Sequence, residues 1–370
     1  MKTTRLVLIA ASAALMACGA DSETSSSTTD TVAAVDVTED AGTQPEDAGP
    51  EDVEADDVRP DTGPIGGPLD DVLRMNHLQA LGTHNSYHLK PDNADMVAQW
   101  NYEHLPLDQQ LGDQGVRQFE LDIYYDPDAE AVEDELPVVH LPVIDPKSTC
   151  PNLSACVAVL KQWSDENLGH HPILILVETK FAYDEDDAQA QIDRLDQAIS
   201  SVWPNDRLVT PAMVMGDSPD LKTALATRGW PTLGELRGRA LFVLHESGKF
   251  RDDYLARGLD KNVLFSDSYG DTSRPSAAYH SMNSPSDPNI ATVVNAGHLV
   301  RTRSDSDSEN LGFASWEKAI ASGAHFISTD YPGTPYGDPY AVNIPGGTPS
   351  GCNPLSAPDE CTSEAIENLK

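Results

Sequence analysis

The stretch VRQFELDIYYD, residues 116–126, decides the fold. It is an apolar run that carries two carboxylates, Glu120 and Asp122, two positions apart. Side chains at i and i+2 of a strand face the same side, so both carboxylates are expected to point together into the mouth of a barrel or its upper layer. Near-continuous apolar character around them is typical of a strand buried on both faces of a parallel sheet.

Three further apolar runs end in polar residues. They are LQALGTHNSYH (78–88) with His84 and Asn85, LPVVHLP (136–142) with His140, and PILILVETK (172–180) with Glu178. A β/α barrel gathers the ends of its parallel strands around one mouth, so residues far apart in sequence converge there. We therefore expect these side chains to meet Glu120 and Asp122.

The fold class follows from apolar runs that alternate with helical patterns. The expected strands are 78–83, 116–123, 137–141, 173–178, 240–245, 262–266, 297–302 and 325–330. Helices are expected at 154–167, 186–202 and 314–323, whereas 124–136 and 267–296 look irregular. Eight strands in one α/β domain predict a distorted (β/α)8 barrel of the TIM type.

A metal centre is the first interpretation of the acidic residues. Asn85, Glu120, Asp122 and Glu178 would form an oxygen-only shell, which suits Ca²⁺ better than zinc. Without a cation the paired acids would repel each other, and Arg117 is an alternative basic partner. Lys180 lies two positions after Glu178 and on the same face, so a simple ion pair is the alternative there.

His84 and His140 are the candidates for proton transfer, since each ends a run near carboxylates. His88, His170, His171 and His280 are expected in loops without chemistry. The main competitor is His245 in FVLHES, which with Glu246 could build a different metal site. Taken together, the residues indicate a metal-assisted phosphodiesterase.

The first 68 residues are not expected to fold. Residues 1–18 have a basic start, a short apolar stretch and small residues, which is typical of an export signal. Its end, LMAC, resembles a bacterial lipobox with Cys18 as the lipidated residue; cleavage without lipidation, giving a secreted protein, is the alternative. Residues 19–68 are rich in Ser, Thr, Asp, Glu, Pro and Gly, and predict a disordered acidic tether.

The folded part, 69–370, is long enough for one large core. Four cysteines remain after Cys18, and their proximity favours Cys150–Cys156 and Cys352–Cys361, the second in a Gly/Pro-rich tail; the spacings are wrong for structural zinc. The formal charge of −36 argues against nucleic acid and against electrostatic adsorption to anionic lipid. We expect an exported monomer, held by lipid at the outer membrane or cell surface.

The ordered motifs resemble the phosphoinositide-specific phospholipase C family, and most closely its bacterial, calcium-dependent branch. They are GTHNSYH, the ELD pair, a second strand-end histidine, a strand-end glutamate, LVRTRSD at 299–305 and SGAHFISTDYP at 322–332. The resemblance covers most of 75–335. It implies a distorted β/α barrel that cleaves phosphatidylinositol by attack of the inositol 2-hydroxyl on phosphorus, giving a cyclic inositol phosphate and diacylglycerol, with possible later hydrolysis of the cycle.

The resemblance also implies roles for single residues. Asn85, Glu120, Asp122 and Glu178 match calcium ligands, and Glu120 or Glu178 would take the hydroxyl proton. His84 matches the residue that stabilises the transition state, and His140 the residue that protonates the leaving glycerol oxygen.

Substrate contacts are expected from Lys180, Arg301, Arg303 and Tyr331. For the arginines the alternative is surface pairing with Asp305, Asp307 or Glu309, and for Tyr331 it is packing at the rim. Two rival functions stay open, a glycerophosphodiester phosphodiesterase and a non-catalytic lipoprotein that binds inositol or a glycan.

Overall fold

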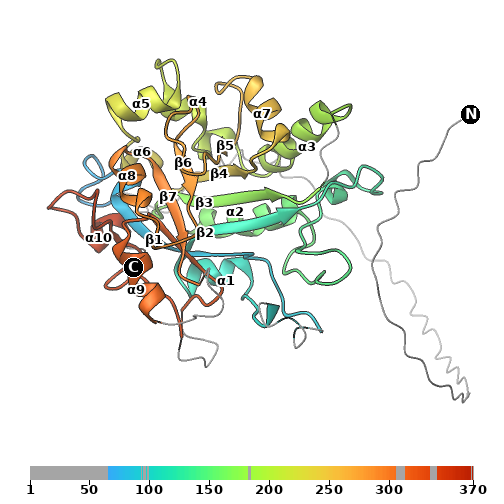
Figure 1. Cartoon of the computed structure of the whole chain (residues 1–370), viewed down its shortest axis with the longest axis horizontal. Coiled ribbons are helices and arrows are strands. Elements are labelled where there is room, and N and C mark those ends of the chain that lie inside the picture. Colours follow the sequence, from blue (N-terminus) through green and yellow to red (C-terminus); the bar gives the residue numbers. More distant parts are fainter. Residues whose placement is uncertain are drawn as a thin grey trace, which may run out of the picture. The chain divides into compact units, whose positions relative to one another are not determined.

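In the described part of this computed structural model, parallel strands follow one another in the order β5-β4-β3-β2-β1-β8-β7-β6 (Figure 1). The structure describes residues 66–92, 94, 97, 100–181, 185–305, 313–333, 340–367 and 369. The predicted export segment with Cys18, and nearly all of the predicted tether, lie outside the described residues.

The strands are short and bring their carboxyl ends to one side. Their bounds are β1 Leu78–Thr83, β2 Val116–Ile123, β3 Ile173–Thr179, β4 Ala240–His245, β5 Phe265–Ser266, β6 Tyr279–Ser281, β7 Leu299–Arg303 and β8 Phe326–Thr329. Between β5 and β6 the contact is one parallel bridge, Asp267 to Tyr279. The barrel is therefore nearly closed, and its distortion lies at this seam.

Helices flank the strands (Figure 1). They are α1 Leu107–Gly112, α2 Leu153–Glu166, α3 Ala188–Ser200, α4 Pro211–Met215, α5 Leu221–Arg228, α6 Leu233–Leu236, α7 Lys249–Ala256, α8 Asn289–Asn295, α9 Phe313–Ala321 and α10 Ser363–Ile366. In α2 the Asn152 side chain caps the first turn by accepting from the amide of Ala155 at 2.8 Å. None of the helices in the described part of the chain has the length and apolarity needed to cross a bilayer.

Strand alternation divides the apolar residues into two cores. In β3, Ile173, Ile175 and Val177 pack in the cluster that includes the inner faces of α2, α3 and α8, whereas Leu174 and Leu176 belong to a second cluster. This second set points into the barrel, as the period of two in a strand requires. At the carboxyl end of each strand, the residues an even number of positions from these inward-facing residues therefore face the mouth of the barrel.

The predicted barrel class is confirmed, with two errors in its parts. The stretch 137–141 is no barrel strand; it lies across the end of β2 through isolated antiparallel bridges such as Ile123 to Val138. Prolines at 137 and 142 bracket it and cannot donate to a sheet ladder. The eighth strand is β6 instead, inside the region 267–296 that was expected to be irregular and that also contains α8.

The C-terminal segment is built into the fold rather than only wrapped around it. Its short strand β9 Gly351–Cys352 pairs antiparallel with β1. The expected disulfides Cys150–Cys156 and Cys352–Cys361 are both present. Close to the chain's end the fully buried Glu367 pairs with the guanidinium of Arg117, which projects from the start of β2.

Replacing Glu367 by glutamine is expected to destabilise the fold by about 3–5 kcal/mol, because a buried guanidinium loses its partner. Burial alone would raise the pKa of Glu367, but Arg117 and His171 lower it to about 2. Its contribution is therefore complete above about pH 4.5 and is lost as the pH falls towards 2. Urea unfolding at several pH values measures both effects. The exposed Glu364→Gln is the matched control, and equal stability of the two variants would contradict this assignment.

Candidate active site

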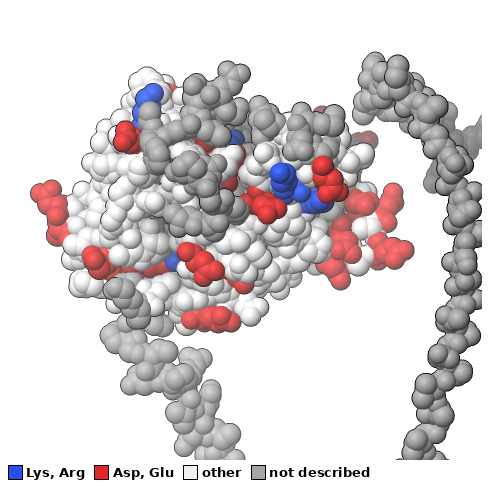
Figure 2. Space-filling view, turned by 90° about the horizontal axis from the view of Figure 1, so that it is seen from below, with Lys and Arg blue, Asp and Glu red and all other residues white. Residues whose placement is uncertain are grey.

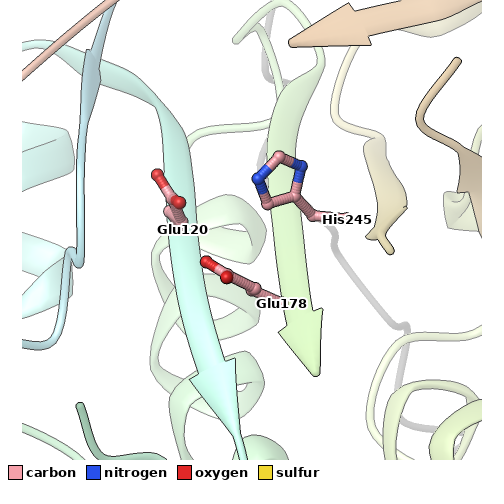
Figure 3. A group of neighbouring side chains, drawn as sticks. All are labelled: Glu120, Glu178 and His245. Atoms are coloured by element: carbon pink, nitrogen blue, oxygen red, sulfur yellow. The ribbon is translucent and has the colours of Figure 1, made fainter. Parts of the chain in front are cut away.

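Three neighbouring strands bring ionisable side chains to one end of the barrel. Asp122 of β2 is in register with Glu178 of β3, and Glu178 is in register with His245 of β4. Glu120 lies two residues before Asp122 and shares its inward face. Figure 3 shows Glu120, Glu178 and His245 turned toward one another. Their potential ligand atoms all lie within 4.8 Å of one another.

Asn85 joins this group from the loop after β1. It adopts a left-handed backbone conformation with φ of 45°, which asparagine tolerates better than most residues. The next residue fixes the loop to β2: the amide of Ser86 donates to the carbonyl of Glu120 at 2.9 Å, and Ser86 Oγ accepts from the Glu120 amide at 2.8 Å. Asn85 is thereby held beside the acidic strand.

Two basic side chains balance the carboxylates. Arg301 of β7 is fully buried and pairs with Glu120. Lys180 lies 2.7 Å from Glu178 Oε1 and 3.4 Å from Asp122 Oδ2. The alternative interpretation of Lys180 as an ion-pair partner of Glu178 is therefore correct in this structure. The ammonium also shows that Asp122 and Glu178 converge on one point.

The pKa values of Asp122 and Glu120 shift in opposite directions. Burial raises the pKa of Asp122, and the neighbouring charge of Glu178 raises it further. Burial opposes ionisation of Glu120 too, but the charge of Arg301 outweighs it and lowers the pKa of Glu120. The charge of Asp122 is thus less well compensated by neighbouring cations than the charge of Glu120.

The donor atoms fit a hard cation. Both carboxylate oxygens of Asp122 and Oδ1 of Asn85 are buried without a hydrogen bond of good geometry. Unsatisfied buried oxygens are costly, and a cation would satisfy them. Asn85, Glu120, Asp122 and Glu178 together offer the oxygen ligands that Ca²⁺ prefers.

Both candidate histidines are oriented by aspartates, of which Asp145 is fully buried and Asp330 partly buried. His84 Nδ1 lies 2.8 Å from Oδ1 of Asp330, and His140 Nδ1 lies 2.8 Å from Oδ2 of Asp145. Each ring is partly exposed, with about a fifth of its side chain accessible (23% and 21%). Fixing Nδ1 leaves Nε2 as the nitrogen available to a substrate.

A third histidine supports His140. His88 Nε2 lies 2.9 Å from Asp145 Oδ2, the same oxygen that His140 contacts. The ring of His88 stacks on Tyr102 at 4.3 Å between centroids. His88 lies in the loop after β1, as expected, and its buried side chain helps to fix Asp145.

Two other residues predicted to contact the substrate, Arg303 and Tyr331, have partners within the protein. Arg303 lies 3.1 Å from Asp330 and 3.5 Å from Asp305, so the alternative of pairing with Asp305 applies to this arginine. Asp307 and Glu309 lie outside the described residues. Tyr331 packs against Tyr102 and Tyr340 at the rim.

Two partnerships that the sequence analysis left open as alternatives do not form in the structure. Arg117 does not balance the acidic pair; it is an odd-numbered residue of β2 and points away from Glu120, towards Glu367. His245 does not form a site with Glu246, which accepts from Thr179 Oγ1 at 2.6 Å. His245 instead faces Glu120 and Glu178, and its Nδ1 lies 2.8 Å from Asp267 Oδ2.

Other histidines lie away from the acidic group. His280 belongs to β6 rather than a loop and stacks on His298, with 2.9 Å between their ring nitrogens. His170 and His171 are fully buried before β3, where His171 lies 3.7 Å from Glu367. Both histidines therefore lie in the buried region around the Arg117–Glu367 pair and not at the barrel end that carries the acidic group.

Comparison with known proteins gives one family. The model of the family described as "Phosphoinositide phospholipase C, Ca2+-dependent" matches residues 73–136 and 126–354. A comparison with curated protein sequences gives no match.

Comparison with solved structures indicates which fold the chain shares. The calcium-dependent phosphoinositol-specific phospholipase C of a Pseudomonas species is 20% identical, with a TM-score of 0.55 over 72% of this chain and 94% of the other. The Ca²⁺-dependent phosphatidylinositol-specific enzyme of Streptomyces antibioticus is 17% identical, with a TM-score of 0.52 over 70% and 95%. At these identities the likeness shows a shared barrel.

Proposed function

The chain belongs to the Ca²⁺-dependent phosphoinositide phospholipase C family, and from this premise we propose that it cleaves phosphatidylinositol on the glycerol side of the phosphate. The products are a cyclic inositol phosphate and diacylglycerol. The observation that carries the proposal is the shared end of the barrel: Glu120, Asp122 and Glu178 lie there on β2 and β3, His84 directly follows β1, and His140 follows Val139, whose amide donates to the carbonyl of Asp122 at 3.2 Å. The Nδ1 atom of each of these two histidines contacts an aspartate. The carboxylates serve metal binding, and the histidines serve proton transfer.

Four residues would hold the calcium ion: Asn85, Glu120, Asp122 and Glu178. Bound calcium lowers the pKa of the attacking hydroxyl and screens negative charge on the phosphate. Glu120 or Glu178 takes the proton from the inositol 2-hydroxyl as its oxygen bonds to phosphorus. The bond from phosphorus to the glycerol oxygen then breaks, and His140 Nε2 gives that oxygen its proton.

His84 is assigned to stabilise the charge that develops on the phosphate oxygens. This role requires both ring nitrogens to carry protons, with the Nδ1 proton shared with Asp330. Burial and the charge of Arg303 lower the pKa of His84, so the anionic phosphate must favour its protonated form. The protonation of the His84 ring therefore depends on the charge of the bound substrate.

The inositol ring is assigned to the same end of the barrel. Lys180, Arg301 and Arg303 are proposed to contact its hydroxyls or the phosphate, and Tyr331 its apolar face. All three cations already pair with carboxylates in the described structure. Extra ring phosphates would compete with those carboxylates, which favours the unphosphorylated headgroup.

Phosphorus NMR of phosphatidylinositol vesicles incubated with the protein, with and without a calcium chelator, tests the function. A cyclic inositol phosphate signal that appears only with calcium is the expected result. Release of glycerol phosphate would instead identify a glycerophosphodiester phosphodiesterase, and absence of turnover would identify a binding protein. Nothing in the described residues favours these two alternatives.

Asp145 provides a prediction about proton transfer. Replacing it by asparagine removes the carboxylate that lies 2.8 Å from His140 Nδ1, so the ring loses its orienting partner and turnover should fall roughly 10–100-fold. A substrate with a better leaving group should recover part of the lost rate, because it depends less on the proton from His140. Asp145→Glu is the matched variant that keeps a carboxylate, and it should lose less activity than Asp145→Asn. Unchanged turnover in Asp145→Asn would contradict the role of Asp145.

The cellular location is proposed from the sequence. We place the protein outside the cytoplasm, with Cys18 lipidated and the acidic segment acting as a tether. Figure 2 shows one face of the protein, on which acidic side chains are more prominent than basic ones, as the acidic composition of the chain leads one to expect.

Replacing Cys18 by serine is expected to move the protein from the membrane fraction to the soluble fraction, because a covalent acyl anchor is lost. Fractionation and immunoblotting measure the distribution. The matched control is Ser22→Ala, just after the predicted anchor. Membrane retention of the Cys18 variant would contradict lipid anchoring.

A further inference from the structure

His245 is held as metal-binding histidines are usually held. Its Nδ1 lies 2.8 Å from Oδ2 of Asp267, and Asp267 is itself fixed by the amides of Ser281 and Tyr269 at 3.0 and 2.8 Å. Metal-ligating histidines commonly use one ring nitrogen for a carboxylate in this way, which orients the other nitrogen and raises its basicity. Figure 3 shows the other nitrogen turned toward the carboxylates.

The resulting donor set differs from the oxygen shell assigned to calcium. Glu120, Glu178 and His245 supply two oxygens and one nitrogen within 4.8 Å of one another. Zinc accepts imidazole nitrogen together with carboxylate oxygen, and its open sites use three protein ligands. Imidazole nitrogen suits zinc or nickel better than it suits calcium, which prefers oxygen. Asp122 and Asn85 are not needed for this second set.

A further buried carboxylate lies beside this donor set. Asp122 is fully buried, and neither of its carboxylate oxygens has a hydrogen bond of good geometry. It faces the same point as Glu178, because Lys180 lies within 3.4 Å of a carboxylate oxygen of each. Asp122 and Glu178 therefore share one ammonium group, and a cation bound at Glu178 would also face Asp122.

We propose that His245 gives this centre a second binding mode, in which His245, Glu120 and Glu178 bind Zn²⁺ or a similar transition metal in competition with calcium. The inference rests on the proposed function, since it concerns the same carboxylates. Zinc in this mode occupies Glu120 and Glu178, so neither carboxylate is available to the calcium ion or to the hydroxyl proton. Added transition metal would then act as an inhibitor that calcium relieves.

Metal binding by the full chain tests the inference without an activity assay. Calorimetric titrations with Zn²⁺ and with Ca²⁺, and the visible spectrum of bound Co²⁺, are compared for wild type, His245→Gln and Asp267→Asn. His77→Gln, at the opposite end of β1, is the matched control. His245→Gln is expected to lower zinc affinity at least roughly 10–100-fold, as loss of a metal ligand or its partner does. Calcium affinity should not change.

Each outcome has a definite meaning. Asp267→Asn should lower zinc affinity in the same direction and alter the Co²⁺ spectrum, whereas His77→Gln should do neither. Unchanged zinc affinity in His245→Gln would overturn the inference, and so would an equal loss of calcium affinity, which would make His245 a general support of the site. Wild type that binds zinc but no calcium would contradict the proposed function and leave this second mode standing.

Discussion

Replacing His140 by alanine is expected to lower turnover of phosphatidylinositol roughly 10²–10⁴-fold, the usual contribution of a positioned general acid. The glycerol oxygen is a poor leaving group unless it receives a proton as its bond to phosphorus breaks. His140 is suited to this step because Asp145 fixes its Nδ1 at 2.8 Å and the ring remains partly exposed. Calcium affinity should not change, since the imidazole is not among the proposed ligands.

Initial rates and calcium titrations of the same preparation measure both quantities. His77→Ala is the control for loss of an imidazole elsewhere in the barrel. A substrate with a better leaving group should recover much of the lost rate in His140→Ala, because it needs less protonation. Parallel loss of rate and of calcium affinity would show that the role of His140 is misassigned.

Replacing Asp122 by asparagine should weaken calcium binding by roughly 10–100-fold, because calcium affinity depends on the number of charged ligands. The same change should not destabilise the metal-free protein. Burial and the charge of Glu178 both raise the pKa of Asp122, which means that its charged form is disfavoured in the empty site. A neutral amide of similar size relieves that repulsion.

Thermal unfolding with and without calcium separates these two effects. Wild type should gain stability with calcium, since a ligand that binds only the folded state raises the melting temperature. Asp122→Asn should melt at or above the wild-type temperature without calcium and gain little when calcium is added. A variant that is less stable in both conditions would point to a structural role. Asp113→Asn, at the exposed end of α1, is the matched control.

The long apolar strands were predictable because their periodicity is strong. The expected bounds of 78–83 and 116–123 match β1 and β2, and 240–245 matches β4. The period of two also placed Glu120 and Asp122 on one face. By contrast β6 has only three residues in a polar region, and a run of that length gives no pattern. The stretch 137–141 looked like a strand because its apolar residues lie over the end of β2.

The sequence could have corrected two errors, one from the period of two and one from the alignment of neighbouring strands. Arg117 and Glu120 are an odd number of positions apart in one strand, so they face opposite sides. His245 ends β4 in register with Glu178 of β3. The two expected strands, 173–178 and 240–245, have the same length, so their last residues could have been expected to lie side by side. The orienting carboxylates Asp330 and Asp145 had no such signal. Their contacts with His84 and His140 depend on the paths of loops, which local pattern does not determine.

A crystal structure of the protein grown with calcium and myo-inositol tests the central claim most directly. The account predicts one calcium ion among Asn85, Glu120, Asp122 and Glu178, with Nε2 of His84 and of His140 on the side where inositol lies. A calcium ion bound elsewhere, or inositol remote from both imidazoles, would contradict it.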